Sequence, residues 1–205
     1  MNLTDIQRHL GVTVDGRMGP NTLAAIARAI GLNEQPKDAF TAALDLILGK
    51  EGGYSDHPRD NGGKTNLGVT RSTWEQWTGK PASEATIRGL TRPMVVPLYR
   101  KNYWDAVNAD QLPPALALCL FDMAVNAGPG RAARILQKVL GVAEDGQIGP
   151  ATIAAVKSWN VRGLVEAYQA GRRAFYRTLD DFDVFGKGWL NRVTEVEAVA
   201  LELLK

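Results

Sequence analysis

Residues 51–70 read EGGYSDHPRDNGGKTNLGVT and contain five glycines, one proline and several Asp and Asn residues. Such residues favour turns, because glycine accepts positive φ and short polar side chains bond to nearby backbone. The composition therefore predicts loops and a small β-hairpin at about residues 54–69.

A helix is expected over residues 37–51, just before the turns, because Phe40, Leu44 and Ile47 share one apolar stripe. This helix ends in Glu51, at the point where an apolar core meets a loop. Burial disfavours a charged carboxyl and raises its pKa, and the C-terminal end of a helix acts in the same direction. Glu51 is therefore a candidate general acid for a glycosidic oxygen.

Asp60 and Thr65 follow Glu51 in the polar part of the same stretch. Asp60 is expected to stay ionised there, and the Thr65 hydroxyl is suited to hold a water. Glycoside hydrolysis uses one protonated and one ionised carboxyl that face each other. Spacing alone also fits a solvated glutamate at a helix end and an aspartate that only forms a turn.

The chain also contains an internal repeat. Residues 7–26 read QRHLGVTVDGRMGPNTLAAI, and residues 137–156 read QKVLGVAEDGQIGPATIAAV. In each copy we expect a helix to end at Leu-Gly, Asp-Gly to form a turn, and Gly-Pro to start a second helix. The pattern predicts a helix-turn-helix unit, which serves either as a compact helical corner or as part of a binding module.

Capping residues and apolar periodicity predict five further helices, which begin near Thr70, Thr91, Pro113, Asn160 and Lys187. Pro97 predicts a kink or break in the second of these before Tyr103. The third is apolar almost all round, as in a central buried helix. The predicted fold class is mainly α, a helical bundle with a small β-hairpin near the active site.

Residues 51–70 closely resemble the signature of the muramidases of glycoside hydrolase family 108, which have a lysozyme-like α+β fold. Residues 99–104 (YRKNYW) and 121–128 (FDMAVNAG) are similar to two further segments of that family. Residues 128–156 resemble the peptidoglycan-binding-type region that completes it. The resemblance covers about residues 40–200 and implies an endolysin- or lysozyme-like N-acetylmuramidase, which hydrolyses the β-1,4 bond between N-acetylmuramic acid and N-acetylglucosamine in bacterial peptidoglycan.

By this resemblance Glu51 is the catalytic acid. The order Glu51, Asp60, Thr65 is similar to that of phage-type lysozymes, although the gap from Asp60 to Thr65 is one residue shorter here. Asp60 with Thr65 is expected to orient a water, and we favour inversion, for which two carboxyl groups stand about 6.5–9.5 Å apart. The expected sugar contacts are Tyr54, Asn66, Tyr103, Trp104 and Asn126, and Trp104 fits a core position equally well.

Three parts of the chain are expected. Residues 1–35 form a peptidoglycan-binding-like helical segment, residues 36–127 the catalytic muramidase core, and residues 128–205 a C-terminal helical region that completes the lysozyme fold. The N-terminal repeat copy resembles peptidoglycan-binding modules with an Asp-Gly-x-x-Gly-Pro-x-Thr pattern, which are about twice as long. It is either a trimmed wall-binding element or a helical piece that packs on the catalytic domain.

Composition limits the other classes of function. The chain has 205 residues, 45% of them hydrophobic, and a net charge of +2, so a core that folds unaided is expected. We expect no nucleic-acid partner, because no run of Lys and Arg occurs, and no membrane insertion, because no run of 18 apolar residues occurs. With a single cysteine, Cys119, and two distant histidines, no disulfide, metal or cofactor is expected.

We expect a monomer that is made in the cytoplasm, since the first twenty residues lack the apolar segment of a signal peptide, and that acts on the cell wall after release. Both a phage lysis enzyme and a bacterial wall-remodelling enzyme fit the sequence. Two other activities stay open: a lytic transglycosylase that works with Glu51 alone, and a wall-binding protein without catalysis.

Overall fold

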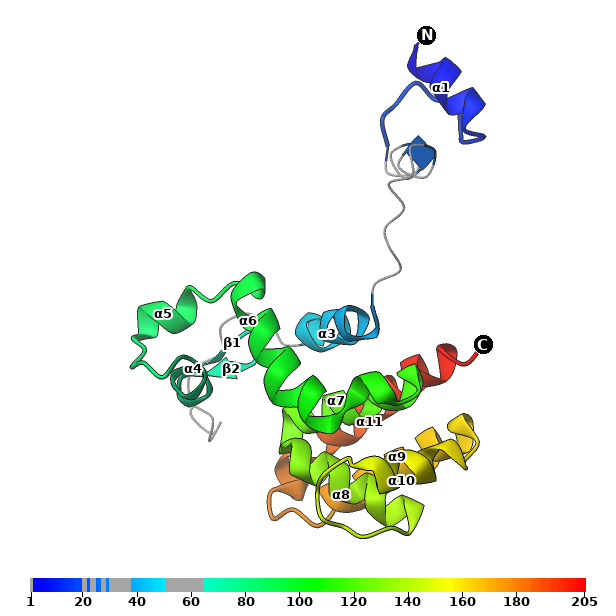
Figure 1. Ribbon diagram of the computed structural model, residues 1–205. Helices are drawn as coiled ribbons and strands as arrows, with labels where there is room; N and C mark the ends of the chain where they lie inside the picture. The colour runs from blue at the N-terminus through cyan, green and yellow to red at the C-terminus, as the bar shows by residue number, and fades with distance from the viewer. Residues whose placement is uncertain (1, 20–21, 23–24, 27–28, 30–37, 51–64) are drawn as a thin grey trace. The chain divides into compact units, whose positions relative to one another are not determined.

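The computed structural model describes residues 2–19, 22, 25–26, 29, 38–50 and 65–205. The chain forms two compact units, Met1–Asp38 and Ala39–Lys205 (Figure 1). Glu51, Tyr54 and Asp60, the first three of the predicted site residues, lie outside the described residues.

The first unit begins with helix α1 (Leu3–His9). Its start is a capping box, because the Asn2 side chain accepts from the Asp5 N–H at 2.9 Å and the Asp5 carboxylate accepts from the Asn2 N–H at 3.1 Å. After the helix, Gly11 and Gly16 have φ of +67° and +69°. Both are left-handed conformations that glycine adopts without a Cβ penalty, which confirms the predicted helix end and turn.

The second unit is a helical bundle with one small sheet (Figure 1). Its elements, in chain order, are α3 (Ala39–Lys50), β1 (Thr65–Asn66), β2 (Val69–Thr70), α4 (Arg71–Thr78), α5 (Glu84–Arg88), α6 (Arg92–Tyr99), η1 (Arg100–Trp104), η2 (Asp105–Val107), η3 (Ala109–Gln111), α7 (Pro114–Ala127), α8 (Pro129–Leu140), α9 (Pro150–Lys157), α10 (Val161–Tyr176) and α11 (Phe182–Glu202).

Helix α7 is the centre of this unit. Every residue from Ala115 to Ala124 is buried, and α7 packs against α3, α8, α10 and α11. A helix surrounded on all sides has no polar face, so its sequence is apolar almost all round. This confirms the central buried helix predicted from the sequence.

One charged residue on α7 is also fully buried. Asp122 pairs with Arg172 of α10 at 2.5 Å and with Arg192 of α11 at 2.9 Å. Arg172 also donates to the Gln169 side chain at 3.1 Å. Because a buried charge without a partner is strongly destabilising, these contacts fix how α10 and α11 sit on α7.

The strands β1 and β2 form an antiparallel hairpin in which Thr65 pairs with Thr70 and Asn66 with Val69. Its two-residue turn has Leu67 at φ +52° and Gly68 at φ +69°, the pair of left-handed residues that a type I′ turn requires. The Tyr99 hydroxyl donates to the Leu67 carbonyl oxygen at 2.9 Å, which holds the turn although leucine rarely adopts positive φ.

The predicted helix starts are confirmed at Thr70 and Asn160, whose side chains accept from Thr73 N–H and Gly163 N–H, both at 3.1 Å. Thr91 precedes α6 but makes no side-chain cap bond. Pro97 lies inside α6, and the α-helix changes to the π-helical turn η1 at Arg100. The break expected before Tyr103 is therefore present, because proline cannot donate an N–H to the helix ladder.

Helix α11 begins earlier than its predicted start at residue 187, although Gly186 and Gly188 disfavour a helix. A Cβ at Gly186 would lie 2.6 Å from ring carbons of Phe182. A side chain at position 186 would therefore collide with the Phe182 ring, and glycine leaves room for this ring against the helix.

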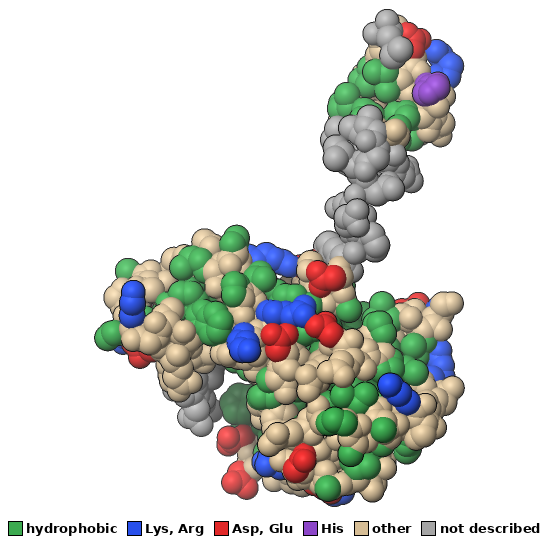
Figure 2. All heavy atoms as spheres, viewed as in Figure 1, with side chains coloured by type: hydrophobic (Ala, Val, Ile, Leu, Met, Phe, Trp, Pro, Cys, Tyr) green, Lys and Arg blue, Asp and Glu red, His purple; other side chains and the backbone are tan. Residues whose placement is uncertain are grey.

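Basic and acidic side chains are interspersed on the face of the second unit shown in Figure 2. Arg100, for example, pairs with Asp105 at 2.8 Å and with Asp110. Among the helices in the described parts of the chain, none is both long enough and apolar enough to cross a membrane.

Candidate active site

Helix α3 brings the chain from the core to the predicted catalytic acid. Leu44 and Ile47 of α3 are buried against the core, and α3 ends at Lys50, the residue before Glu51. The described chain resumes at Thr65, the first residue of β1. Helix α3 and strand β1 therefore flank residues 51–64 in the sequence.

Thr65 is partly buried and pairs with Thr70 across the hairpin. Among the residues that the structure describes, no hydrogen bond of its hydroxyl is found.

Asn66 is buried, and its amide nitrogen lies within hydrogen-bond distance of three backbone carbonyl oxygens, those of Ile87 at 3.1 Å, Arg88 at 3.0 Å and Leu90 at 3.3 Å. These bonds tie the hairpin to the end of α5. The amide nitrogen of Asn66 therefore has a structural role, and a sugar contact of Asn66 stays a prediction.

Tyr103 lies in η1, and its ring packs on the Tyr99 ring with centroids 5.6 Å apart. Burial raises the pKa of the Tyr103 hydroxyl, so this group stays a neutral donor at neutral pH. Trp104 is buried, and its indole N–H donates to Asp110 at 2.8 Å. Of its two possible roles, the structure gives Trp104 the core position.

Asn126 is exposed in the last turn of α7, and its side-chain N–H donates to the Asp122 carbonyl oxygen at 2.7 Å. Its amide oxygen therefore projects from a fixed position. Two groups of contacts result. Tyr103 packs on Tyr99, whose hydroxyl bonds to the turn of the β1–β2 hairpin. Asn126 instead bonds to the backbone of Asp122, whose carboxylate pairs with Arg192.

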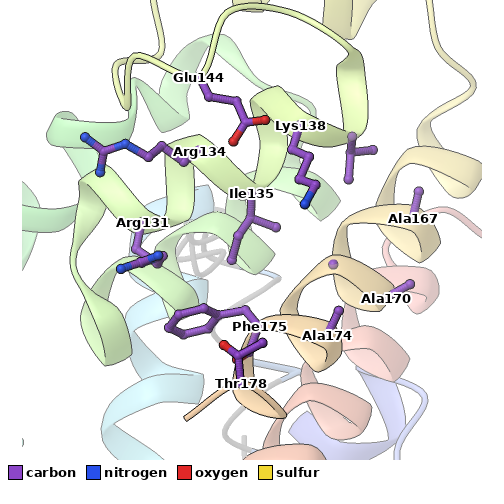
Figure 3. Close-up of a pocket in the computed structure, with 12 residues that line it drawn as sticks. Arg131, Arg134, Ile135, Lys138, Glu144, Ala167, Ala170, Ala174, Phe175 and Thr178 are labelled. Carbon is purple, nitrogen blue, oxygen red and sulfur yellow. The ribbon is translucent and has the colours of Figure 1, made fainter.

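A separate groove lies between α8 and α10 (Figure 3). It has a volume of about 590 Å³, and its residues are Arg131, Arg134, Ile135, Lys138, Val139, Glu144, Ala167, Ala170, Gly171, Ala174, Phe175 and Thr178. Three of these are basic and one is acidic. The Arg131 guanidinium lies over the Phe175 ring, 4.8 Å from its centroid, an attractive cation–π contact.

Sequence reasoning missed this groove. Arg131, Arg134 and Lys138 recur at intervals of three and four residues, so one face of a helix must carry all three. This spacing is the feature of the sequence from which a basic helix face could have been predicted. In the described parts of the chain, no three Cys, His, Asp or Glu side chains converge in a way that suits a metal ion.

Comparisons with known proteins match two regions of the chain. Residues 44–128 match the family model described as Glycosyl hydrolase 108, and residues 131–194 match the model described as Predicted Peptidoglycan domain. Among solved structures, that of SagA from Brucella abortus is 40% identical, with a TM-score of 0.77 over 82% of this chain and 96% of the other. A comparison with curated proteins gives no match.

The fold and the two matched regions define a glycoside hydrolase with a lysozyme-like fold that acts on peptidoglycan. The chain belongs to the glycosyl hydrolase 108 family. The first match contains the whole stretch from Glu51 to Thr70, and the second contains every residue that lines the α8–α10 groove.

Proposed function

We propose that this chain is an N-acetylmuramidase that hydrolyses the β-1,4 bond between N-acetylmuramic acid and N-acetylglucosamine, with Glu51 as the general acid. The observation that carries the proposal is that the region matched to the glycosyl hydrolase family contains Glu51, Asp60 and Thr65. Helix α3, whose Leu44 and Ile47 are buried in the core, ends at Lys50 directly before Glu51.

In the proposed mechanism Glu51 donates its proton to the glycosidic oxygen as the bond to the leaving sugar breaks. Asp60 accepts a proton from a water that attacks the opposite face of the sugar, and the Thr65 hydroxyl orients this water. This route inverts the configuration at the anomeric carbon. Tyr54, Tyr103 and Asn126 are the proposed sugar contacts.

We assign the parts of the chain as follows. Residues 36–127 are the catalytic core, residues 128–205 complete the lysozyme fold, and residues 1–35 are a wall-binding segment. The α8–α10 groove supports contact with the wall, since the cations Arg131, Arg134 and Lys138 suit the carboxylates of peptidoglycan stem peptides. The enzyme acts as a monomer of the endolysin type, reaching the wall after its release.

Replacing Glu51 with Gln tests the proposal. The rate at which purified sacculi clear is expected to fall by about 10²–10⁴-fold, the usual contribution of a general acid. Glu166→Gln is the matched control, because Glu166 is an exposed carboxyl on α10, and it is expected to clear sacculi at the wild-type rate. Clearing by Glu51→Gln at the rate of this control would refute the assignment of Glu51.

A further inference from the structure

The α8–α10 groove has a wall of small side chains opposite a basic wall (Figure 3). Helix α10 contributes Ala167, Ala170 and Ala174, which leave space beside the helix. A Cβ at Gly171 would lie 2.9 Å from the Ile135 side chain, so the glycine lets α10 approach α8 closely at this point. The groove volume of about 590 Å³ lies within the usual range for a ligand pocket.

The opposite wall carries all the charged residues of α8, and every one is basic. Arg131, Arg134 and Lys138 are exposed, and within the part of the chain that the structure describes none of them forms an ion pair or a side-chain hydrogen bond. The Arg131 guanidinium is held over the Phe175 ring, a contact that neutralises no charge. Figure 3 shows Lys138 pointing from α8 into the space between the two helices. This wall therefore offers unpaired cations to an anionic ligand.

The remaining charges around the groove do not reverse this sign. Glu144, in the loop before α9, also lines the groove, so the lining residues carry three positive charges and one negative charge. The other exposed charges of this loop and of α10 balance one another. The acidic ones are Asp145 and Glu166, and the basic ones are Arg162 and Arg177.

Two further arginines of α10 do not line the groove, because Arg172 pairs with Asp122 and Arg173 pairs with Glu197. Past Thr178, the last residue that lines the groove, the chain becomes mainly acidic. The exposed charges that follow are Asp180, Asp181, Asp183 and Lys187. The groove therefore has a basic side wall and an acidic stretch of chain beyond Thr178.

One component of peptidoglycan matches this pattern. Its sugars are N-acetylated and carry no charge, whereas its stem peptides carry several carboxylates, an amine and the small apolar side chain of alanine. The cations of α8 suit the carboxylates, Glu144 suits the amine, and the alanines of α10 suit an apolar methyl group. The region matched to the model described as Predicted Peptidoglycan domain contains every residue that lines the groove.

We propose that the α8–α10 groove binds the stem peptide of peptidoglycan, with Arg131, Arg134 and Lys138 on its carboxylates. The proposal rests on the proposed function, which supplies the substrate, and it adds a selectivity. Glycan strands that still carry their peptides bind more tightly than strands from which the peptides have been removed, because only the former have anionic groups for the groove.

The test is the binding of a disaccharide tetrapeptide prepared from sacculi. In this fragment N-acetylglucosamine precedes N-acetylmuramic acid, so it lacks the bond that the proposed reaction breaks, and the wild-type protein can be titrated by calorimetry. The double variant Arg131→Gln/Lys138→Gln is expected to bind the fragment about tenfold more weakly, because it loses charge-assisted hydrogen bonds. The same disaccharide without peptide is expected to bind both proteins equally.

Lys157→Gln/Lys187→Gln is the matched control. Both lysines are exposed and lie outside the groove, and their replacement changes the net charge by the same amount. This control is expected to bind the disaccharide tetrapeptide as wild type does. Ala170→Leu is a second variant, which narrows the groove without a change of charge and is expected to weaken binding by a similar factor. The melting temperatures are expected to stay close to that of wild type, because every replaced side chain is exposed.

The outcomes separate the two proposals. If the groove variants bind the disaccharide tetrapeptide as wild type does, or if the control loses as much affinity as they do, the groove proposal is wrong and the hydrolase assignment is unaffected. An equal loss of affinity for the peptide-free disaccharide would make the glycan the occupant and would also overturn the proposal. If only the groove variants lose affinity for the peptide but wild-type protein hydrolyses no sacculi, the groove proposal stands and the proposed function fails.

Discussion

The two copies of the repeat fold to the same polar network. In the first, the Gln7 amide nitrogen donates to Asp15 at 2.7 Å and to the Arg17 carbonyl at 2.9 Å. In the second, Gln137 donates to Asp145 at 2.6 Å and to the Gln147 carbonyl at 2.9 Å.

The glutamine oxygens also match. Gly16 N–H donates to Gln7 and Gly146 N–H to Gln137, both at 2.9 Å. Both glutamines are buried, so each network satisfies polar groups that would otherwise be costly.

The surroundings of the two copies differ. Ile148 of the second copy is 2% exposed, and its carbonyl oxygen accepts from Asn108 at 2.7 Å. Met18, at the same place in the first copy, is 51% exposed. The comparison teaches that the local sequence is sufficient to form the helical corner, whereas burial against other helices makes the second copy part of the core of residues 39–205.

The largest effect is expected from Gln137→Leu. It leaves Asp145, the Gly146 N–H and the Gln147 carbonyl without their partner, and we expect the free energy of unfolding of residues 39–205 to fall by about 2–4 kcal/mol. Urea unfolding followed by tryptophan fluorescence measures this change, because all five Trp residues lie in the second unit.

Gln7→Leu is the matched variant for that experiment. It breaks the same network in the first unit, and the tryptophan transition is expected to stay unchanged. An equal loss from both variants would contradict the view that only the second copy belongs to the core of residues 39–205.

A smaller effect is expected from Gly146→Ala. Gly146 has φ +80°, and a Cβ there would lie 3.0 Å from the Arg134 guanidinium carbon. The left-handed conformation costs a non-glycine residue about 1–2 kcal/mol. The free energy of unfolding measured from the same tryptophan transition is therefore expected to fall by about that amount. Gly163→Ala, in a helix, serves as the control, and a loss of the same size there would remove the conformational explanation.

The smallest effect concerns pH. Bonds donated by Gln137 and by the Gln147 backbone lower the pKa of Asp145 below its ordinary value of 3.8. Asp145 therefore contributes stability above that value, and this contribution is lost as pH falls through the folded pKa. Gln137→Ala is expected to raise the pKa of Asp145 in an NMR titration while the pKa of Asp15 in the other unit stays fixed. An unchanged Asp145 would mean that the glutamine does not stabilise its charge.

Much of this fold could be predicted from the sequence, because the signals are local. Gly11, Gly16, Gly141 and Gly146 all take the left-handed conformation that the repeat predicts. Thr70 and Asn160 cap their helices. The central helix α7 shows its burial directly in its apolar composition.

Other features depend on partners distant in sequence. The repeat shows that glutamine occurs at the same place in both copies, as Gln7 and Gln137. It does not show that each side chain is buried and hydrogen-bonded to the turn of its own copy. The position of Asn66 depends on carbonyl groups at the end of α5, and the start of α11 depends on Phe182 packing over Gly186. For the site, the sequence provides Glu51, Asp60 and Thr65 as a hypothesis, and of these the described structure includes Thr65.

Mass spectrometry of the products released from sacculi in ¹⁸O-water tests the central claim most directly. For wild-type protein the account predicts muropeptides with reducing N-acetylmuramic acid ends that carry one ¹⁸O from water, and for Glu51→Gln it predicts almost no release. Anhydro-muramic ends without ¹⁸O would show a lytic transglycosylase instead, and undiminished release by Glu51→Gln would contradict the account.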